Sequence, residues 1–168
     1  MEHSELDRLK SGPAQGQQSD VGTFFFIVRC ASDAEAVLRR IKDVVSVVVQ
    51  NSTEPWPSDE MWRRLLPAWY VSRCAPEESR EKAEAWLRHF KSLPHEQQVK
   101  ANEAREWSLG NWIYWFQPDN REWFWWNGRV EDSNTLRVTV ESAELPFPYD
   151  ALVWLFRASG ATQVEPEM

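Results

Sequence analysis

The chain has 168 residues, of which 42% are apolar and 27% are charged. This composition excludes a disordered chain, which lacks the apolar area to offset its ordering entropy, and the length predicts one domain. The net charge of −7 disfavours binding to phosphate backbones and anionic lipid, and no stretch approaches the roughly 20 apolar residues of a membrane span.

Residues 1–21 are predicted to form a disordered arm, because they carry Ser, Gly, Pro, Gln and charged residues without an apolar period. The first 18 residues contain no apolar core of the kind found in signal peptides. Cys30 and Cys74 have neither the number nor the spacing of a secreted disulfide framework. These features together predict a cytoplasmic protein.

Residues 22–162 are predicted to form a single α+β domain that begins with a strand and a helix. The run 23–28 is aromatic and β-branched on both faces, which favours a strand covered on each side. Ser32 and Glu35 have the spacing of a capping box and open a predicted amphipathic helix. Residues 44–49 are almost all valine, whose restricted side-chain torsion favours a second strand.

The middle of the chain alternates helix and strand signals between prolines. Residues 58–66 are predicted to form a short helix with acidic residues in its first turn, and residues 68–72 a strand. Pro76 has the position of a first helical residue, and the helix that it opens carries an apolar stripe with Trp86. A polar helix is predicted to follow at residues 95–107.

The pattern changes in the C-terminal third of the chain. Residues 111–117, 121–126 and 135–141 predict three strands, because turn-forming Pro, Asn, Asp and Gly residues separate them. A closing helix is predicted at residues 149–158, and residues 163–168 are predicted to form a flexible tail. The chain is therefore predicted to be an α+β protein with a mixed sheet, in which a C-terminal antiparallel three-stranded meander packs against several helices.

A five-residue similarity links two parts of this predicted sheet. Residues 29–33 and 73–77 each lie between an aromatic run and a helix start. If the two strands are parallel neighbours, Cys30 and Cys74 lie at carboxyl ends of strands, where open α/β sheets bind ligands. The alternative is that both cysteines are small buried residues of the core.

The sequence contains no nucleotide-binding motif, and it predicts no cofactor, no metal site and no catalytic residue. Its six glycines are scattered and form no phosphate-binding loop. His89 and His95 are six residues apart, which is not the spacing that places two ligands on one helix face. The sequence offers little support for an enzyme, although a cysteine–histidine pair that meets only in the fold stays an alternative.

The most unusual feature is the density of aromatic rings between residues 107 and 126. The chain has eleven tryptophans, and so many indoles are rarely all buried. In a strand, Trp123 and Trp125 lie on one side and Phe124 and Trp126 on the other. One side must pack under the helices. The other is either covered as well or exposed as a platform of rings that binds a partner.

Acidic residues accumulate in the same part of the chain. From residue 110 onward there are nine carboxylates against four arginines, a net charge of −5. If the carboxylates cluster in space, this surplus attracts a basic partner, and otherwise it only maintains solubility. We therefore predict a surface that binds a basic protein, formed by Trp112, Trp115, Trp123, Trp125, Trp126, Asp119, Glu122, Glu131 and Asp132.

The segment from Asn111 to Ala161 ends in ALVWLFRASGA. It resembles small acidic bacterial proteins that include toxin immunity proteins and uncharacterised proteins. The resemblance covers under a third of the chain and assigns no functional residue. It implies a non-enzymatic inhibitor in the cytoplasm that occupies the active site of a toxin.

Two other functions are compatible with the sequence. In one, an apolar cleft between sheet and helices, lined by indoles and polar groups such as Arg73, Cys30 or Tyr70, binds a small molecule or catalyses a reaction. In the other, the protein is an accessory subunit of a larger assembly. Nucleic acid and membranes are not predicted partners, since stacking platforms for bases normally lie in a basic groove.

Overall fold

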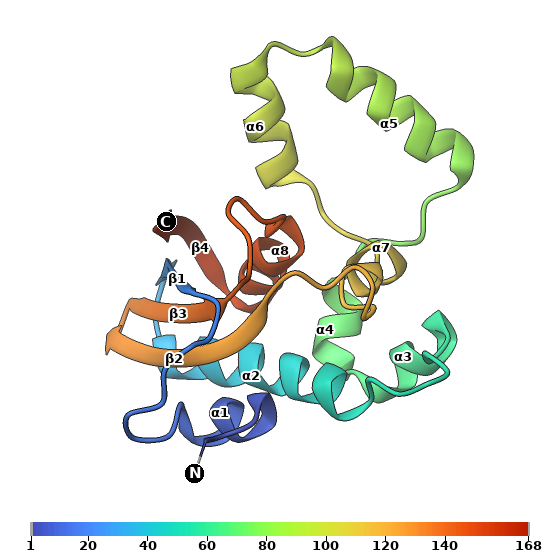
Figure 1. Ribbon diagram of the computed structural model, residues 1–168. Coiled ribbons are helices and arrows are strands. Elements are labelled where there is room, and N and C mark those ends of the chain that lie inside the picture. Colours follow the sequence, from blue (N-terminus) through green and yellow to red (C-terminus); the bar gives the residue numbers. More distant parts are fainter. Residues whose placement is uncertain (1, 168) are drawn as a thin grey trace.

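A computed structural model describes residues 2–167, which form helices around one sheet (Figure 1). The α+β class is confirmed. No helix within these residues is long and apolar enough to cross a membrane. In chain order the elements are α1 (Glu5–Ser11), β1 (Thr23–Cys30), α2 (Ala34–Gln50), α3 (Asp59–Leu65), α4 (Ala68–Arg73), α5 (Arg80–Ser92), α6 (His95–Ala104), α7 (Leu109–Tyr114), β2 (Phe124–Asp132), β3 (Thr135–Glu141), α8 (Asp150–Ser159) and β4 (Ala161–Glu167).

The sheet has the strand order β2-β3-β1-β4, with β1 and β3 in the centre. Each pairing between the described strands is antiparallel, so the prediction of a mixed sheet is wrong. The pairing of β1 with β3 runs from Thr23 opposite Glu141 to Arg29 opposite Thr135. This order leaves β2 and β4 as the two edge strands.

One face of the sheet carries the core. In β1, Phe26 and Val28 are fully buried on this face, and the ring of Phe26 packs edge-on against Phe156 of α8 at a centroid distance of 5.6 Å. Phe25 and Ile27, which point to the opposite face, are only half-buried. The prediction of a strand covered on each side is therefore wrong, and β1 has the alternation of an antiparallel sheet with one covered face.

Helix α2 continues through the valine run that was expected to form a second strand. Its N-cap is Asp33, whose carboxylate accepts a hydrogen bond from the Ala36 amide at 3.2 Å. Val44, Val45 and Val48 are fully buried, at the spacing of one helix face. Burial of this face against the sheet outweighs the modest helix propensity of valine.

Helix α4 occupies the residues that were predicted to form a strand at 68–72. Residues 29–33 and 73–77 are consequently not two copies of one strand-to-helix unit, because Cys30 ends a strand and Cys74 caps a helix. Within α4, Tyr70 is fully buried and packs against Trp112 with ring centroids 4.8 Å apart. A run of aromatic and apolar residues this short does not show whether its period is that of a strand or of a buried helix.

The predicted three-stranded meander is a two-stranded hairpin. Residues 109–114 form helix α7, which Ser108 caps by accepting a hydrogen bond from the Asn111 amide. Leu109, Trp112 and Ile113 are buried on one side of this helix. The remaining hairpin joins β2 to β3 through a tight turn.

The N-terminal residues are not the disordered arm that the sequence predicts. Residues 5–11 form helix α1, which begins with a capping box between Ser4 and Asp7 and buries Leu9. The helix lies beside β2 and α2 (Figure 1). The helix was not predicted because the segment has few apolar residues. One buried leucine is enough to pack it, since polar side chains make its other contacts with the sheet. Residue 1 lies outside the described part of the chain.

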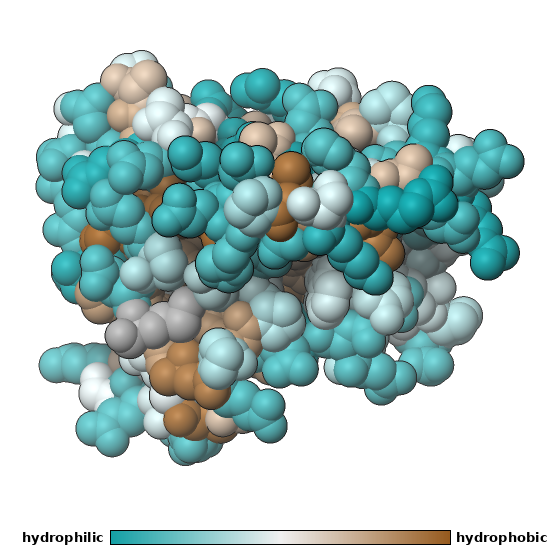
Figure 2. Space-filling view, turned by 90° about the horizontal axis from the view of Figure 1, so that it is seen from above, coloured by the Kyte–Doolittle hydropathy of each residue, from teal (hydrophilic) through white to brown (hydrophobic). Residues whose placement is uncertain are grey.

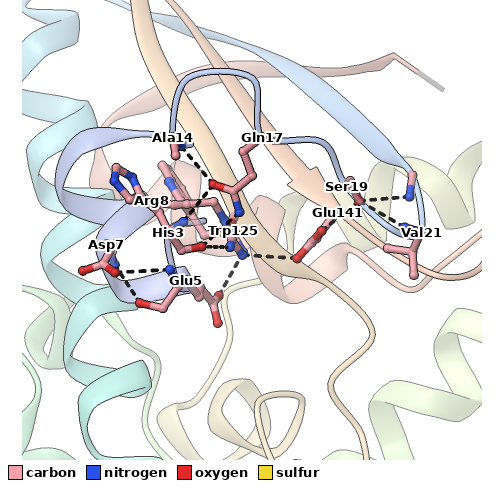
Figure 3. Close-up of polar contacts among 12 residues, drawn as sticks. His3, Glu5, Asp7, Arg8, Ala14, Gln17, Ser19, Val21, Trp125 and Glu141 are labelled. Atoms are coloured by element: carbon pink, nitrogen blue, oxygen red, sulfur yellow. Dashed lines mark hydrogen bonds and ion pairs between the residues drawn. The ribbon is translucent and has the colours of Figure 1, made fainter. Parts of the chain in front are cut away.

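Two ion pairs attach α1 to the sheet and to the residues before β2, and Figure 3 shows the one between Arg8 and Glu141. Arg8, only 7% exposed, donates from Nε to the Trp125 carbonyl at 3.0 Å and pairs with Glu141 at 3.2 Å. Glu5 accepts a hydrogen bond from the Trp125 amide at 2.9 Å and pairs with Arg121. The side chains of α1 therefore satisfy both backbone groups of Trp125 in edge strand β2.

The C-terminal residues form a strand. Gly160, with a φ of +123°, turns the chain from α8 directly into β4. β4 extends to Glu167 and pairs with β1, so residues 163–167 are not the flexible tail that was predicted, and residue 168 lies outside the described part of the chain.

Helices α5 and α6 lie outside the core, and extended segments connect them to it (Figure 1). Neither helix has a buried residue. Their positions agree with the prediction, although α5 starts after Ser79 and not at Pro76. The rings of Trp86 and Phe90 stack at 5.0 Å, and the Arg105 guanidinium lies 4.0 Å from the Trp86 ring centroid.

Replacing Arg8 with alanine tests the attachment of α1. The change leaves the Glu141 carboxylate without its cation and the Trp125 carbonyl without its donor, so the free energy of unfolding should fall by about 3 kcal/mol in urea titrations. Lys10→Ala, at an exposed position of the same helix, is the matched control and should change stability by less than about 0.5 kcal/mol. Equal effects of the two substitutions would show that the ion pairs do not hold α1 in place.

Candidate functional site

Three of the five tryptophans predicted to contact a partner belong to the core. Trp112, Trp123 and Trp125 are at most 2% exposed, so they cannot form a surface. Trp115 and Trp126 are half-buried, and an arginine of α1 covers the ring of Trp126 at 4.9 Å. The prediction of a ring platform is wrong for two reasons. Helix α7 replaces one of its strands, and α1 packs beside the other.

The four carboxylates predicted to accompany these rings are exposed, but they lie in two places. Asp119 and Glu122 precede β2, whereas Glu131 and Asp132 end it. The strand between them spans roughly 25 Å at about 3.3 Å per residue. Glu131 also pairs with two arginines of the hairpin, at 3.0 and 3.1 Å. These carboxylates therefore do not make one acidic surface.

A concavity lies elsewhere, between α6, α8 and β4, and we call it the α6–β4 cleft. Its volume of about 700 Å³ lies within the usual range of ligand sites. Figure 1 shows α6 facing α8 and β4, and Figure 2 shows that the side carrying α5 and α6 is mostly hydrophilic, with apolar residues visible between the polar ones. Arg73, Cys30 and Tyr70, which the sequence proposed as polar groups of a cleft, do not line it.

Aromatic rings form much of the inner wall of the cleft. Trp154 of α8 is 5% exposed, while Trp107 and Tyr149 are half-buried and present part of their rings to the cleft. Opposite them, Val99 of α6 is 45% exposed. A half-open aromatic wall facing an exposed valine provides apolar area that a bound molecule can cover.

Polar contacts connect α6 to α8 across the base of the cleft. The Arg157 guanidinium donates to the backbone carbonyls of Glu103 and Arg105 and lies 5.7 Å from the Trp154 ring centroid. Asn102 donates from Nδ2 to Asp150 at 3.3 Å. The positive charge of Arg157 is therefore already engaged by protein groups.

The charges of two carboxylates act on the Tyr149 hydroxyl. Burial raises the pKa of Tyr149, and the negative charges of Asp150 and Glu103 raise it further. Both carboxylates line the cleft, and neither forms an ion pair within residues 2–167. Lys100 is the cation on the same helix wall. The end of the cleft at Tyr149 is consequently negative and aromatic.

A half-buried cysteine, Cys74, lies next to Trp154 of the cleft wall. Burial raises the pKa of Cys74 to about 11, although hydrogen bonding with Tyr70 and Trp154 works in the opposite direction. Neither Tyr70 Oη nor Trp154 Nε1 has a partner of ordinary hydrogen-bond geometry within residues 2–167. Their contacts with the sulfur are therefore weak. The thiol stays protonated at neutral pH and is a poor nucleophile.

Sequence reasoning missed the residues of this cleft because no local motif joins them. They come from residues 99 to 107, 149 to 157 and 162 to 166, which meet only in the folded chain. The one available signal was Trp107, the first ring of the aromatic segment, next to a polar helix.

Comparisons of the chain with protein-family models, with curated proteins and with solved structures find no match. In the described part of the chain, no group of three or more His, Cys, Asp or Glu side chains could hold a metal ion. The function is therefore inferred from the geometry and charge of the cleft.

Adjacent tryptophans in β2 should respond differently to truncation. Trp125→Ala empties a fully buried site and should lower the free energy of unfolding by about 3–5 kcal/mol, whereas Trp126→Ala, at a half-buried ring under Arg8, should cost about 1–2 kcal/mol. Chemical denaturation of the two variants measures both values. Losses of equal size would mean that Trp126 is as much a part of the core as Trp125.

The raised pKa of Cys74 predicts a loss of stability at alkaline pH. The folded state keeps the thiol neutral up to a pKa of about 11, whereas the unfolded chain ionises near 9. The stability linked to this group is therefore complete below pH 9 and is lost as the pH rises to about 11. Urea titrations across this range should show a shallower decline for Cys74→Ala than for the original chain. Ser72→Ala, at an exposed neighbour, should decline like the original chain, and parallel curves for all three proteins would contradict the linkage.

Proposed function

We propose that this protein is a binding protein that holds a basic segment of a partner protein in the α6–β4 cleft. The observation that carries the proposal is that two carboxylates without an ion pair in the described residues, Glu103 and Asp150, line the same cleft as the half-buried rings of Trp107 and Tyr149. A lysine or arginine side chain needs both features, because its stem packs on apolar surface and its charge interacts with ring faces and anions.

The form of the cleft supports a polypeptide ligand. Its volume of about 700 Å³ accommodates several side chains, and three different elements form its walls. The net charge of −7 accelerates encounter with a basic partner over the whole surface, while the carboxylates in the cleft fix the position of the bound charge.

This proposal keeps the chemistry of the partner expected from the sequence and changes the surface. The buried tryptophans of β2 and α7 stabilise the fold, and the cleft provides the contacts. A bacterial toxin, the partner that the resemblance implies, would have the required charge if its active site is basic. In that case the protein inhibits by occupying the site and performs no chemistry itself.

A library of synthetic peptides tests the charge preference. Acetylated, fluorescein-labelled hexapeptide pools carry lysine, arginine, glutamine or glutamate at one fixed position, and fluorescence polarisation measures their binding to the full chain. Pools with a fixed lysine or arginine should bind about 10-fold more tightly than those with glutamate, and salt raised from about 0.05 M to about 0.5 M should weaken them. Equal binding of all pools would contradict the proposal.

Substitutions in the cleft assign this preference to particular residues. Glu103→Gln and Asp150→Asn should each weaken the lysine pools by about 3- to 10-fold, and Lys100→Gln should strengthen them, because it removes one of the two cations that line the cleft. The matched control is Glu96→Gln, which removes an exposed carboxylate of α6 outside the cleft. An equal effect of Glu96→Gln and Glu103→Gln would show that only the net charge matters.

A further inference from the structure

The two edges of the sheet differ in whether their outward backbone groups have hydrogen-bond partners. On the β2 side, side chains of α1 occupy the backbone amide and carbonyl of Trp125. On the other side, β4 pairs only with β1, and its outer edge faces the α6–β4 cleft. Thr162, Val164 and Pro166 of β4 line the cleft. One wall of the proposed binding site is therefore an edge strand.

The register shows which backbone groups of β4 point outward. The Cys30 amide donates to the Asn134 carbonyl at 2.7 Å on the β3 side, so even-numbered residues of β1 direct their backbone groups toward β3. Odd-numbered residues such as Ile27 then point to β4, where Glu165 lies opposite. Successive residues of a strand alternate in this direction. The N–H and C=O groups of Val164, a residue that lines the cleft, consequently point away from β1.

The free edge is short. Val164 offers one donor and one acceptor, while Pro166 offers only its carbonyl because proline has no N–H. Toward the start of the strand, the register shifts between Arg29 and Cys30, opposite Ala161. Regular pairing on the outer edge is therefore limited to the few residues around Val164.

We infer that the partner segment binds as an added β-strand along the outer edge of β4, with its backbone hydrogen-bonded to Val164. This inference rests on the proposed function. In strand addition, backbone hydrogen bonds give affinity and pockets for alternate side chains give specificity. Tyr149 packs against Phe26 at 5.5 Å on the helix-covered face of the sheet. Alternate side chains of the added strand therefore point toward Tyr149 and the carboxylates beside it.

The charges of β4 favour a basic segment over a second copy of the same strand. Glu165 and Glu167 lie on the strand itself, and Glu165 forms an ion pair with Arg29 at 3.5 Å. Two β4 strands paired edge to edge bring these carboxylates near each other, and a proline next to the pairing residue shortens the ladder further. A partner strand that carries lysine or arginine brings no further carboxylates to this edge and has no proline opposite Val164.

Amide hydrogen exchange tests this mode of binding. The probe is the tightest lysine-containing hexapeptide from the polarisation assay, added at saturation to the ¹⁵N-labelled full chain. Exchange at the Val164 amide should slow by about 10-fold or more, because the amide gains a partner in the added strand. The amides of Gln163 and Glu165, which already face β1, are the internal controls and should change less.

Backbone methylation of the peptide provides a second measurement that does not depend on the folding of a variant. Two peptide series are methylated at alternate amide nitrogens, so that only one series removes the donors facing β4. That series should lose about 10-fold or more in affinity, and the other should bind like the unmodified peptide. Val164→Pro should reproduce the loss, because it removes the outward donor and keeps the neighbouring residues that face β1.

The outcomes separate this inference from the function on which it rests. If the peptide depends on Glu103 and Asp150 but leaves Val164 exchange unchanged and tolerates both methylated series, strand addition is wrong and the proposed function stands. If no pool prefers a basic residue, both fail. If the Val164 amide is protected without peptide and sedimentation shows a dimer, a second copy occupies the edge and the inference is overturned.

Discussion

The backbone groups at the two edges of its antiparallel sheet constrain this protein more than any single side chain does. An unpaired edge is open to pairing with another chain unless the protein covers it. On the β2 side the fold covers it with α1, whose Arg8 and Glu5 occupy the carbonyl and amide of Trp125. On the β4 side the edge opens into a cleft. This difference between the edges places the candidate site.

The cleft follows from the way in which the last helix and strand are joined. Gly160 turns α8 directly into β4, so both elements lie against β1 and form adjacent walls. Helix α6 closes the third side through Arg157, which donates to carbonyls at the end of α6. Aromatic rings and two carboxylates then lie within reach of the free backbone of Val164. Apolar area, negative charge and unpaired hydrogen-bonding groups occur together there, and we propose a basic extended segment as the ligand because it would use all three.

Local patterns predicted part of the fold. The α+β class, β1, β3 and the helices α3 and α8 follow from periodicity and from turn residues between elements. The valines of α2 and the aromatic runs of α4 and α7 were predicted as strands, because short apolar runs carry no period and burial in tertiary contacts decides their conformation.

The same limit applies to the prediction of the site. Whether an indole is core or surface depends on what packs beside it in the fold, and the α1 residues that bond to the Trp125 backbone lie more than a hundred positions away. Residues 99–107 and 162–166 meet only after folding, so no local pattern of the sequence could bring the cleft together.

Photo-crosslinking tests most directly whether the α6–β4 cleft, and not the tryptophan-rich hairpin, contacts the partner. A lysine-bearing hexapeptide with a benzophenone group is irradiated with the full chain, and mass spectrometry identifies the residues that it attaches to. The account predicts attachment within residues 99–107, 149–157 and 162–166, and attachment concentrated in residues 112–132 would contradict it.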